Sequence, residues 1–164
     1  DKTVTLDDND LIVQALYKEA GKSTNWWRNV GAAIVDNGKI IAIAHNGSVP
    51  TEYSSAIDGD PRITENRGME VDTSIDLHAE ARLISEAAKN GTTFAGKTLF
   101  ATTFPCASCA KLIATSGITA CYFVEGYASI DGQAIMKSSG VELIKVDAAP
   151  KTHSRQLSKK YRSN

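Results

Sequence analysis

Two short motifs constrain the fold of this chain more than any other feature of its sequence. They are His78-Ala79-Glu80 and Pro105-Cys106-Ala107-Ser108-Cys109. Cys106 and Cys109 are three positions apart, so they share one face if the segment is helical. Thiolates and an imidazole are typical metal ligands, and the ligands of one ion must converge on one point. The chain therefore has to bring two distant segments together.

We interpret His78, Cys106 and Cys109 as the three protein ligands of a zinc ion. Three protein ligands leave a fourth position for water, which is typical of catalytic zinc, whereas structural zinc uses four protein ligands. Glu80 follows His78 by two residues, so it can exchange protons with that water without ligating the metal. We therefore predict a hydrolytic centre in which Glu80 is the catalytic acid and base.

Two other interpretations of the C-x-x-C pair fit less well. A redox pair would leave His78 and Glu80 without a role. A structural zinc site would lack its fourth ligand, because Cys121 lies in a strand pattern, and His45 and His153 have no suitable neighbours. A non-catalytic zinc module remains the alternative of a different class, and Glu80→Gln would separate the two, since only a catalyst has turnover to lose.

The periodicity of apolar residues predicts alternating strands and helices. We expect strands at 30–35, 39–45, 97–103, 119–124 and 141–146, and helices at 11–20, 77–89, 105–116 and 129–138. We expect Asp76 to cap the helix at 77–89, which would bury Leu77, Ala81, Ile84 and Ala88. Segment 46–74 has no sustained periodicity and is expected to form a long loop. This order predicts a three-layer α/β/α fold with a central mixed five-stranded sheet.

Composition is that of an ordinary globular protein. We expect one domain at residues 1–147 and a basic C-terminal tail at 148–164. The formal net charge of −1 gives no support for nucleic-acid or membrane-surface binding. No apolar run approaches the length of about 20 residues that a membrane span needs. Three cysteines, an odd number, disfavour a disulfide scaffold, so we expect a reducing compartment, the cytoplasm.

The combination of H-x-E with P-C-x-x-C resembles the zinc-dependent cytidine deaminase superfamily. Over residues 23–146, the chain is most similar to the deoxycytidylate (dCMP) deaminases of that superfamily. Besides the long loop before His78, three stretches carry this resemblance: Arg28-Asn29-Val30-Gly31-Ala32, His45-Asn46-Gly47-Ser48-Val49-Pro50 and Glu125-Gly126-Tyr127.

The resemblance implies a cytidine deaminase-like fold and the hydrolysis of a cytosine nucleotide, dCMP first, to its uracil form. Activated water would attack C4 of the ring while Glu80 protonates N3 and then the departing ammonia. The resemblance also assigns substrate-binding residues: Asn46 for the sugar, the N–H of Ala79 for the base carbonyl, and Arg28 and Tyr127 for the nucleotide side of the pocket.

From the residues alone, simpler interpretations of these positions stay open. Asn46-Gly47 is a common turn, Arg28 could be a surface charge, and Tyr127 could serve packing. Arg62 and Arg67 could each meet a phosphate as a bidentate donor.

The sequence also departs from the dCMP deaminase pattern. Many members carry Cys and His ligands for a second zinc near the long loop, but residues 46–77 contain neither, so we predict one zinc per chain. Asn is common after H-A-E, where this chain has Ala81-Arg82. The alternative substrates are a free base or nucleoside, such as cytosine, guanine or cytidine. Adenosine of tRNA is disfavoured by the charge balance. The resemblance further implies a homo-oligomer, since neighbouring subunits often complete each pocket.

Overall fold

A computed structural model describes residues 2–4, 10–61, 74–126 and 130–147 of the chain. Its centre is a six-stranded mixed sheet with the strand order β1-β8-β7-β6-β2-β3. The strands of this sheet are β1 (Lys2–Val4), β2 (Gly31–Asp36), β3 (Lys39–His45), β6 (Thr98–Thr103), β7 (Ala120–Glu125) and β8 (Glu142–Val146). A separate two-stranded ladder joins β4 (Gly47–Ser48) to β5 (Asp76–Leu77).

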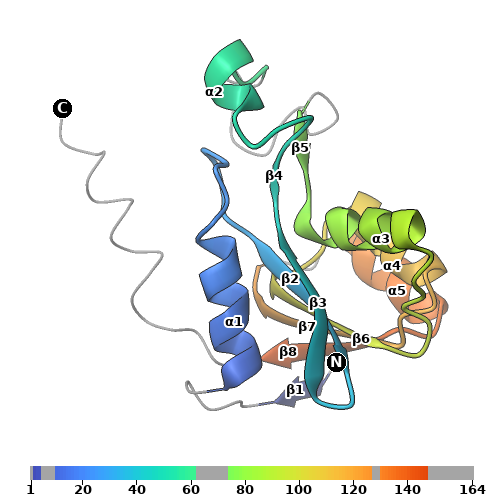
Figure 1. The fold of residues 1–164 in the computed structure, drawn as a ribbon. Coiled ribbons are helices and arrows are strands. Elements are labelled where there is room, and N and C mark those ends of the chain that lie inside the picture. Colours follow the sequence, from blue (N-terminus) through green and yellow to red (C-terminus); the bar gives the residue numbers. More distant parts are fainter. Residues whose placement is uncertain (1, 5–9, 62–73, 127–129, 148–164) are drawn as a thin grey trace.

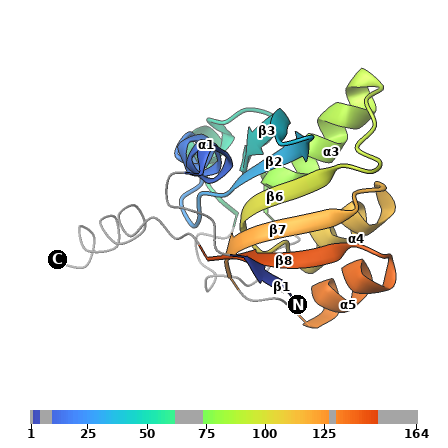
Figure 2. The ribbon, with the colours of Figure 1, turned by 90° about the horizontal axis from the view of Figure 1, so that it is seen from below.

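Helices cover the central sheet on both sides, which confirms the predicted three layers. They are α1 (Leu11–Ala20), α2 (Ser54–Asp58), α3 (Ala79–Asn90), α4 (Ala107–Thr115) and α5 (Ile130–Ser138). Helix α1 lies on one face of the sheet, and α3, α4 and α5 lie on the other (Figures 1 and 2). Short α2 stands apart from these layers, beyond β4 and β5 (Figure 1).

Strands β2 and β3 form the opening hairpin of the sheet. Strands β2 and β3 are antiparallel, and Asn37 and Gly38 join them with φ angles of 48° and 75°. Two consecutive positive φ angles are typical of the tight turns that suit the twist of a hairpin, and Asn-Gly adopts them readily. Strand β2 also pairs antiparallel with β6, after which β6, β7 and β8 run parallel. Parallel strands require crossover connections, which α4 and α5 provide.

The predicted number of strands was one too low. Strand β1 pairs in parallel with β8, with Lys2 opposite Ile144 and Val4 opposite Val146. Its three residues are too few to show a periodicity, so only its partner strand identifies it. The predicted tail at 148–164 lies outside the described residues, and the division of the chain at residue 147 stays a prediction.

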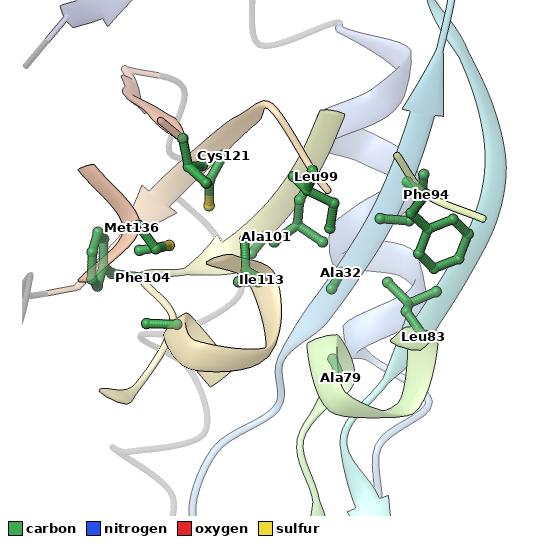
Figure 3. Packing of buried hydrophobic residues seen from close by; sticks show 14 of the residues in the cluster. Ala32, Ala79, Leu83, Phe94, Leu99, Ala101, Phe104, Ile113, Cys121 and Met136 are labelled. Atoms are coloured by element: carbon green, nitrogen blue, oxygen red, sulfur yellow. The ribbon is translucent and has the colours of Figure 1, made fainter. Parts of the chain in front are cut away.

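Strand β2 separates two halves of the core because its side chains alternate between the faces. Ala32 and Ile34 face the cluster under α3 and α4, and Ala33 and Val35 face the cluster under α1. Figure 3 shows part of the larger cluster, in which Leu83 of α3 is fully buried. Burying such a leucine contributes about 1.5–3 kcal/mol to folding. Burial on both faces explains why this strand is apolar along nearly its whole length.

Helix α3 begins later and turns a different face inward than the sequence predicted. Its first residue is Ala79, and His78 is its N-cap, while Asp76 belongs to β5. The buried residues of α3 are Ala79, Glu80, Leu83 and Ala87. Of the four positions predicted to be buried, Ile84 packs against the core only in part and Ala88 is exposed. The β4–β5 ladder explains the later start, because it keeps the chain extended up to Leu77.

The segment predicted as one long loop contains defined structure. Gly47 pairs with Leu77 and Ser48 with Asp76, so the ends of the excursion lie side by side. Asp76 accepts hydrogen bonds from Ser48 Oγ and from the Asn25 side chain. Residues 62–73 lie outside the described part of the chain. Within the part that is described, no helix combines the length and apolar character needed to cross a membrane.

Candidate metal and catalytic site

The two sequence motifs meet at the N-termini of two neighbouring helices. His78 is the N-cap of α3, and Cys106 is the N-cap of α4, with Cys109 in the first turn. Helix α4 follows the C-terminal end of β6, while α3 follows the β4–β5 ladder, and both helices cover the same face of the sheet (Figure 1). Helix N-termini favour negative charge by about 0.3–1 kcal/mol each. The start of α4 therefore favours the thiolate form of its N-cap, Cys106.

The three predicted ligands are close enough to hold one ion. His78 Nδ1 lies 3.4 Å from Cys106 Sγ and 3.5 Å from Cys109 Sγ. All three ligand atoms lie within 4.8 Å of one another. A tetrahedral zinc ion with bonds of about 2.0–2.3 Å holds its N and S ligands about 3.5–3.8 Å apart. The donor set and its spacing therefore fit zinc, as predicted.

The protonation of the ligands also suits a cation. A hydrogen bond from Cys109, assisted by His78, lowers the pKa of the Cys106 thiol to about 4, although burial opposes the shift. The hydrogen bond to Cys106, together with burial, raises the pKa of Cys109. The hydrogen bond with Cys106 likewise raises the pKa of His78. The three groups thus share protons at one point, and a divalent cation bound there would replace those protons.

Glu80 lies beside this cluster without belonging to it. Its side chain is buried, with 3 % of the residue exposed, in the first turn of α3. Burial raises the pKa of its carboxyl group, and the carboxyl also interacts with the Cys109 thiol. A buried carboxyl with a raised pKa can hold a proton near neutral pH and release it to a substrate. The arrangement therefore supplies a proton carrier next to a metal site.

Asn46 lies next to the end of the β4–β5 ladder that leads into His78. The ladder pairs Gly47 with Leu77, so Asn46 and His78 flank the same end of the ladder. The Asn46 amide oxygen accepts a hydrogen bond of 2.7 Å from the Val30 N–H, and its Nδ2 donates one of 2.8 Å to the Arg28 carbonyl. The Asn46 side chain therefore holds the backbone just before β2. These two hydrogen bonds are compatible with its predicted role in binding a sugar.

The other predicted substrate-binding residues are placed differently. Ala79 is fully buried and is the first residue of α3. Because the N–H groups of the first turn have no acceptor within the helix, the Ala79 N–H is available to a ligand. Arg28 is half-exposed and lies 3.9 Å from Glu125, which also accepts a hydrogen bond of 2.8 Å from the Tyr17 hydroxyl. Tyr127 lies outside the described residues, as do Arg62, Arg67 and His153.

Among the described residues, neither Cys121 nor His45 belongs to the cluster of possible metal ligands. Cys121 is fully buried in the core, as predicted, and burial raises its pKa. His45 Nδ1 lies 2.8 Å from Glu19 Oε1. Burial alone would raise the pKa of Glu19, but hydrogen bonds from Lys22 and His45 lower it. His45 is thus part of an ionic network, which no local sequence pattern indicated.

Zinc analysis of purified variants tests this site. Wild-type protein is expected to carry one zinc per chain, and Cys106→Ser is expected to lose most of it, because serine is a poor ligand for zinc. Cys121→Ser is the matched control and is expected to keep its zinc, since Cys121 lies in the core. Two zinc ions per chain, or equal loss in both variants, would contradict the assignment.

Comparison with known proteins agrees with the site. The family of the cytidine and deoxycytidylate deaminase zinc-binding region matches residues 7–125. Deoxycytidylate deaminase of Enterobacteria phage T2 is 29% identical over 170 residues, covering 83% of this chain and 89% of that protein. The human deoxycytidylate deaminase is 35% identical over 115 residues, covering 70% of this chain and 61% of that protein.

A solved structure supports the same relationship. It is the dCMP deaminase of cyanophage S-TIM5 in complex with dCMP and dUMP, which matches with a TM-score of 0.62 and 27% identity. The match covers 82% of this chain and 93% of that one. The matched family region contains both motifs and every predicted metal ligand. This chain therefore belongs to the cytidine and deoxycytidylate deaminase family.

Proposed function

We propose that this chain is a zinc-dependent hydrolase that converts a cytosine nucleotide, dCMP, to its uracil form, dUMP. The observation that carries the proposal is the buried Glu80 carboxyl beside three converging zinc ligands. A structural zinc site has no need for a buried acid with a raised pKa, whereas a hydrolytic site does. The relatives named deoxycytidylate deaminase support the choice of dCMP.

The reaction exchanges one substituent of the cytosine ring. The bond from C4 to the amino nitrogen breaks, a bond from C4 to the oxygen of water forms, and ammonia leaves. Held by His78, Cys106 and Cys109, zinc would lower the pKa of water toward about 7. Glu80 would take one proton from the attacking water and pass it to ring N3. It would then take the second proton from the new hydroxyl group on C4 and give it to the departing amine, which leaves the C4 carbonyl of uracil. One carboxyl group can serve these transfers because it lies beside the metal ligands and burial raises its pKa, which favours its protonated form.

The backbone and Asn46 would orient the substrate. The Ala79 N–H, at the start of α3, is suited to donate to the base carbonyl at C2, because the helix N-terminus also favours the partial negative charge there. The two hydrogen bonds of the Asn46 amide use its oxygen and one Nδ2 hydrogen. The second Nδ2 hydrogen can then donate to a sugar hydroxyl.

The phosphate would lie toward Arg28. Its pair with Glu125 is long, at 3.9 Å, and the two side chains are 47% and 39% exposed. An exposed pair of this kind contributes little to stability, so a phosphate can compete for the guanidinium at small cost. Tyr127, which follows Glu125 and Gly126 in the sequence, stays a predicted neighbour of the nucleotide.

We further propose that the protein assembles with copies of itself in a reducing compartment, the cytoplasm. Large apolar side chains are exposed on and before α2, with Tyr53 68% and Ile57 75% exposed, and such surface favours association. None of the three cysteines forms a disulfide, which supports a reducing compartment.

Light scattering tests the assembly. The measured molar mass is expected to be a multiple of 17.5 kDa, and the mass of a monomer would contradict the assembly.

A substrate panel tests the proposed reaction. Ammonia release by the zinc-loaded protein is measured with dCMP, CMP, deoxycytidine, cytosine and guanine. We expect the highest kcat/KM for dCMP, at least about tenfold above deoxycytidine, because a paired phosphate adds a charged interaction. Activity confined to a free base or a nucleoside would keep the hydrolytic centre but overturn the nucleotide.

A further inference from the structure

Residues 46–53 form the loop that carries Asn46. This loop is joined at two levels to α3, the helix whose N-cap is His78. The first level is the β4–β5 ladder, which places Asn46 and His78 at its end and continues with a hydrogen bond of 2.9 Å from the Val49 N–H to the Ile75 carbonyl. A ladder of two residue pairs is short, and an isolated two-stranded unit is at best marginally stable. The side-chain hydrogen bonds of Asn46 tie it to Val30 and Arg28, not to α3, so a second connection to α3 adds to the ladder in fixing Asn46 relative to the zinc ligands.

Arg82 and Glu52 form that second connection. Arg82 lies on α3, one turn after His78, and its Nη2 donates to Glu52 Oε1 at 2.8 Å and to the Gly47 carbonyl at 3.3 Å. One guanidinium thus contacts both the residue that follows Asn46 and the residue at the far end of the same loop. The hydrogen bonds of Arg82 therefore connect α3, whose N-cap is His78, to the loop that carries Asn46, the predicted ligand of the sugar.

Glu52 collects further contacts that hold it in this position. The Thr24 hydroxyl donates to its carbonyl oxygen at 2.7 Å, and His45 Nε2 lies 3.7 Å from the same Oε1 that Arg82 contacts. A Cβ atom at Gly47 would lie 2.0 Å from Glu52 Oε2, so the carboxylate packs directly on the Gly47 backbone. Only glycine leaves room for this arrangement.

The environment makes the pair stronger than an ordinary surface ion pair. The side chains of Arg82 and Glu52 are only 22% and 29% exposed. Arg82 Nε is buried and has no hydrogen-bond acceptor among the residues described, so the charge of the guanidinium depends on its Nη2 contacts. Removing either partner would leave the other charge partly desolvated and with weaker contacts only, which are the Gly47 carbonyl for Arg82 and His45 for Glu52.

We propose that Arg82 and Glu52 are a positioning pair, which holds the Asn46 loop against the first turn of α3 and thereby sets the affinity for the substrate. The inference rests on the proposed deaminase function and extends it to residues that touch neither metal nor substrate. Breaking the pair is expected to let Asn46 move away from the ligands, so that binding weakens while the chemistry at Glu80 continues.

Kinetics of Arg82→Met and Glu52→Gln test the pair. Each variant is expected to raise KM for dCMP about tenfold, with kcat changed less than about twofold and zinc content unchanged. The KM of the double variant is expected to be no higher than the KM of the more impaired single variant, because both changes remove the same interaction. Arg82→Lys, which keeps the charge, is expected to recover part of the wild-type KM.

The ion pair of Lys97 with Asp36 provides a matched control. Its distance is 2.6 Å and its side chains are 28% and 33% exposed, so it resembles the proposed pair. Asp36 and Lys97 lie at the opposite end of β2 and β6 from His45 and Cys106. Lys97→Met is expected to leave KM unchanged. An equal rise of KM in the control, an unchanged KM in both test variants, or a loss of zinc together with kcat would overturn the proposal.

Hydrogen exchange separates this inference from the proposed function. The Val49 amide is expected to exchange faster in Arg82→Met than in wild type or Lys97→Met, because its hydrogen bond belongs to the loop that the pair holds. A wild-type protein that deaminates no cytosine compound would remove the proposed function itself. Faster Val49 exchange would then still support the positioning role, and unchanged exchange would overturn it.

Discussion

The convergence of two helix N-termini over one end of the sheet is the constraint on which the rest of this structure depends. His78, Cys106 and Cys109 can approach within metal-binding distance only if α3 and α4 begin side by side. That placement requires β6 to end beneath α4, and it requires the β4–β5 ladder to deliver the chain to His78. The apolar core under α3 and α4 then holds both helices in place.

The sequence predicted those parts that local chemistry determines. The ligands were predictable because few side chains bind zinc, and the spacing of Cys106 and Cys109 suits a single helical turn. The tight turn at Asn37-Gly38 and the cap of α1 also depend on local chemistry. The Asp10 carboxylate accepts hydrogen bonds from the N–H groups of Ile12 and Val13. Each of these features lies within a few residues of its signal.

The parts that escaped prediction depend on partners far along the chain. Strand β1 is recognisable only beside β8, and the start of α3 is set by the pairing of Gly47 with Leu77. The pair of Glu52 with Arg82 joins residues separated by 30 positions, so no periodicity could have indicated it. The departure at Ala81-Arg82 from the residues common in dCMP deaminases was visible in the sequence, and the proposed pair with Glu52 gives Arg82 a physical role.

The proposed proton transfers all pass through Glu80, so the activity of Glu80→Gln is the measurement to make. This substitution keeps the shape of the side chain but removes its titratable group. With zinc content and folded state equal to wild type, deamination of dCMP is expected to fall by at least about 10²-fold, the lower range for loss of a general acid and base. Wild-type turnover in a zinc-loaded Glu80→Gln protein would show that Glu80 does not carry the protons.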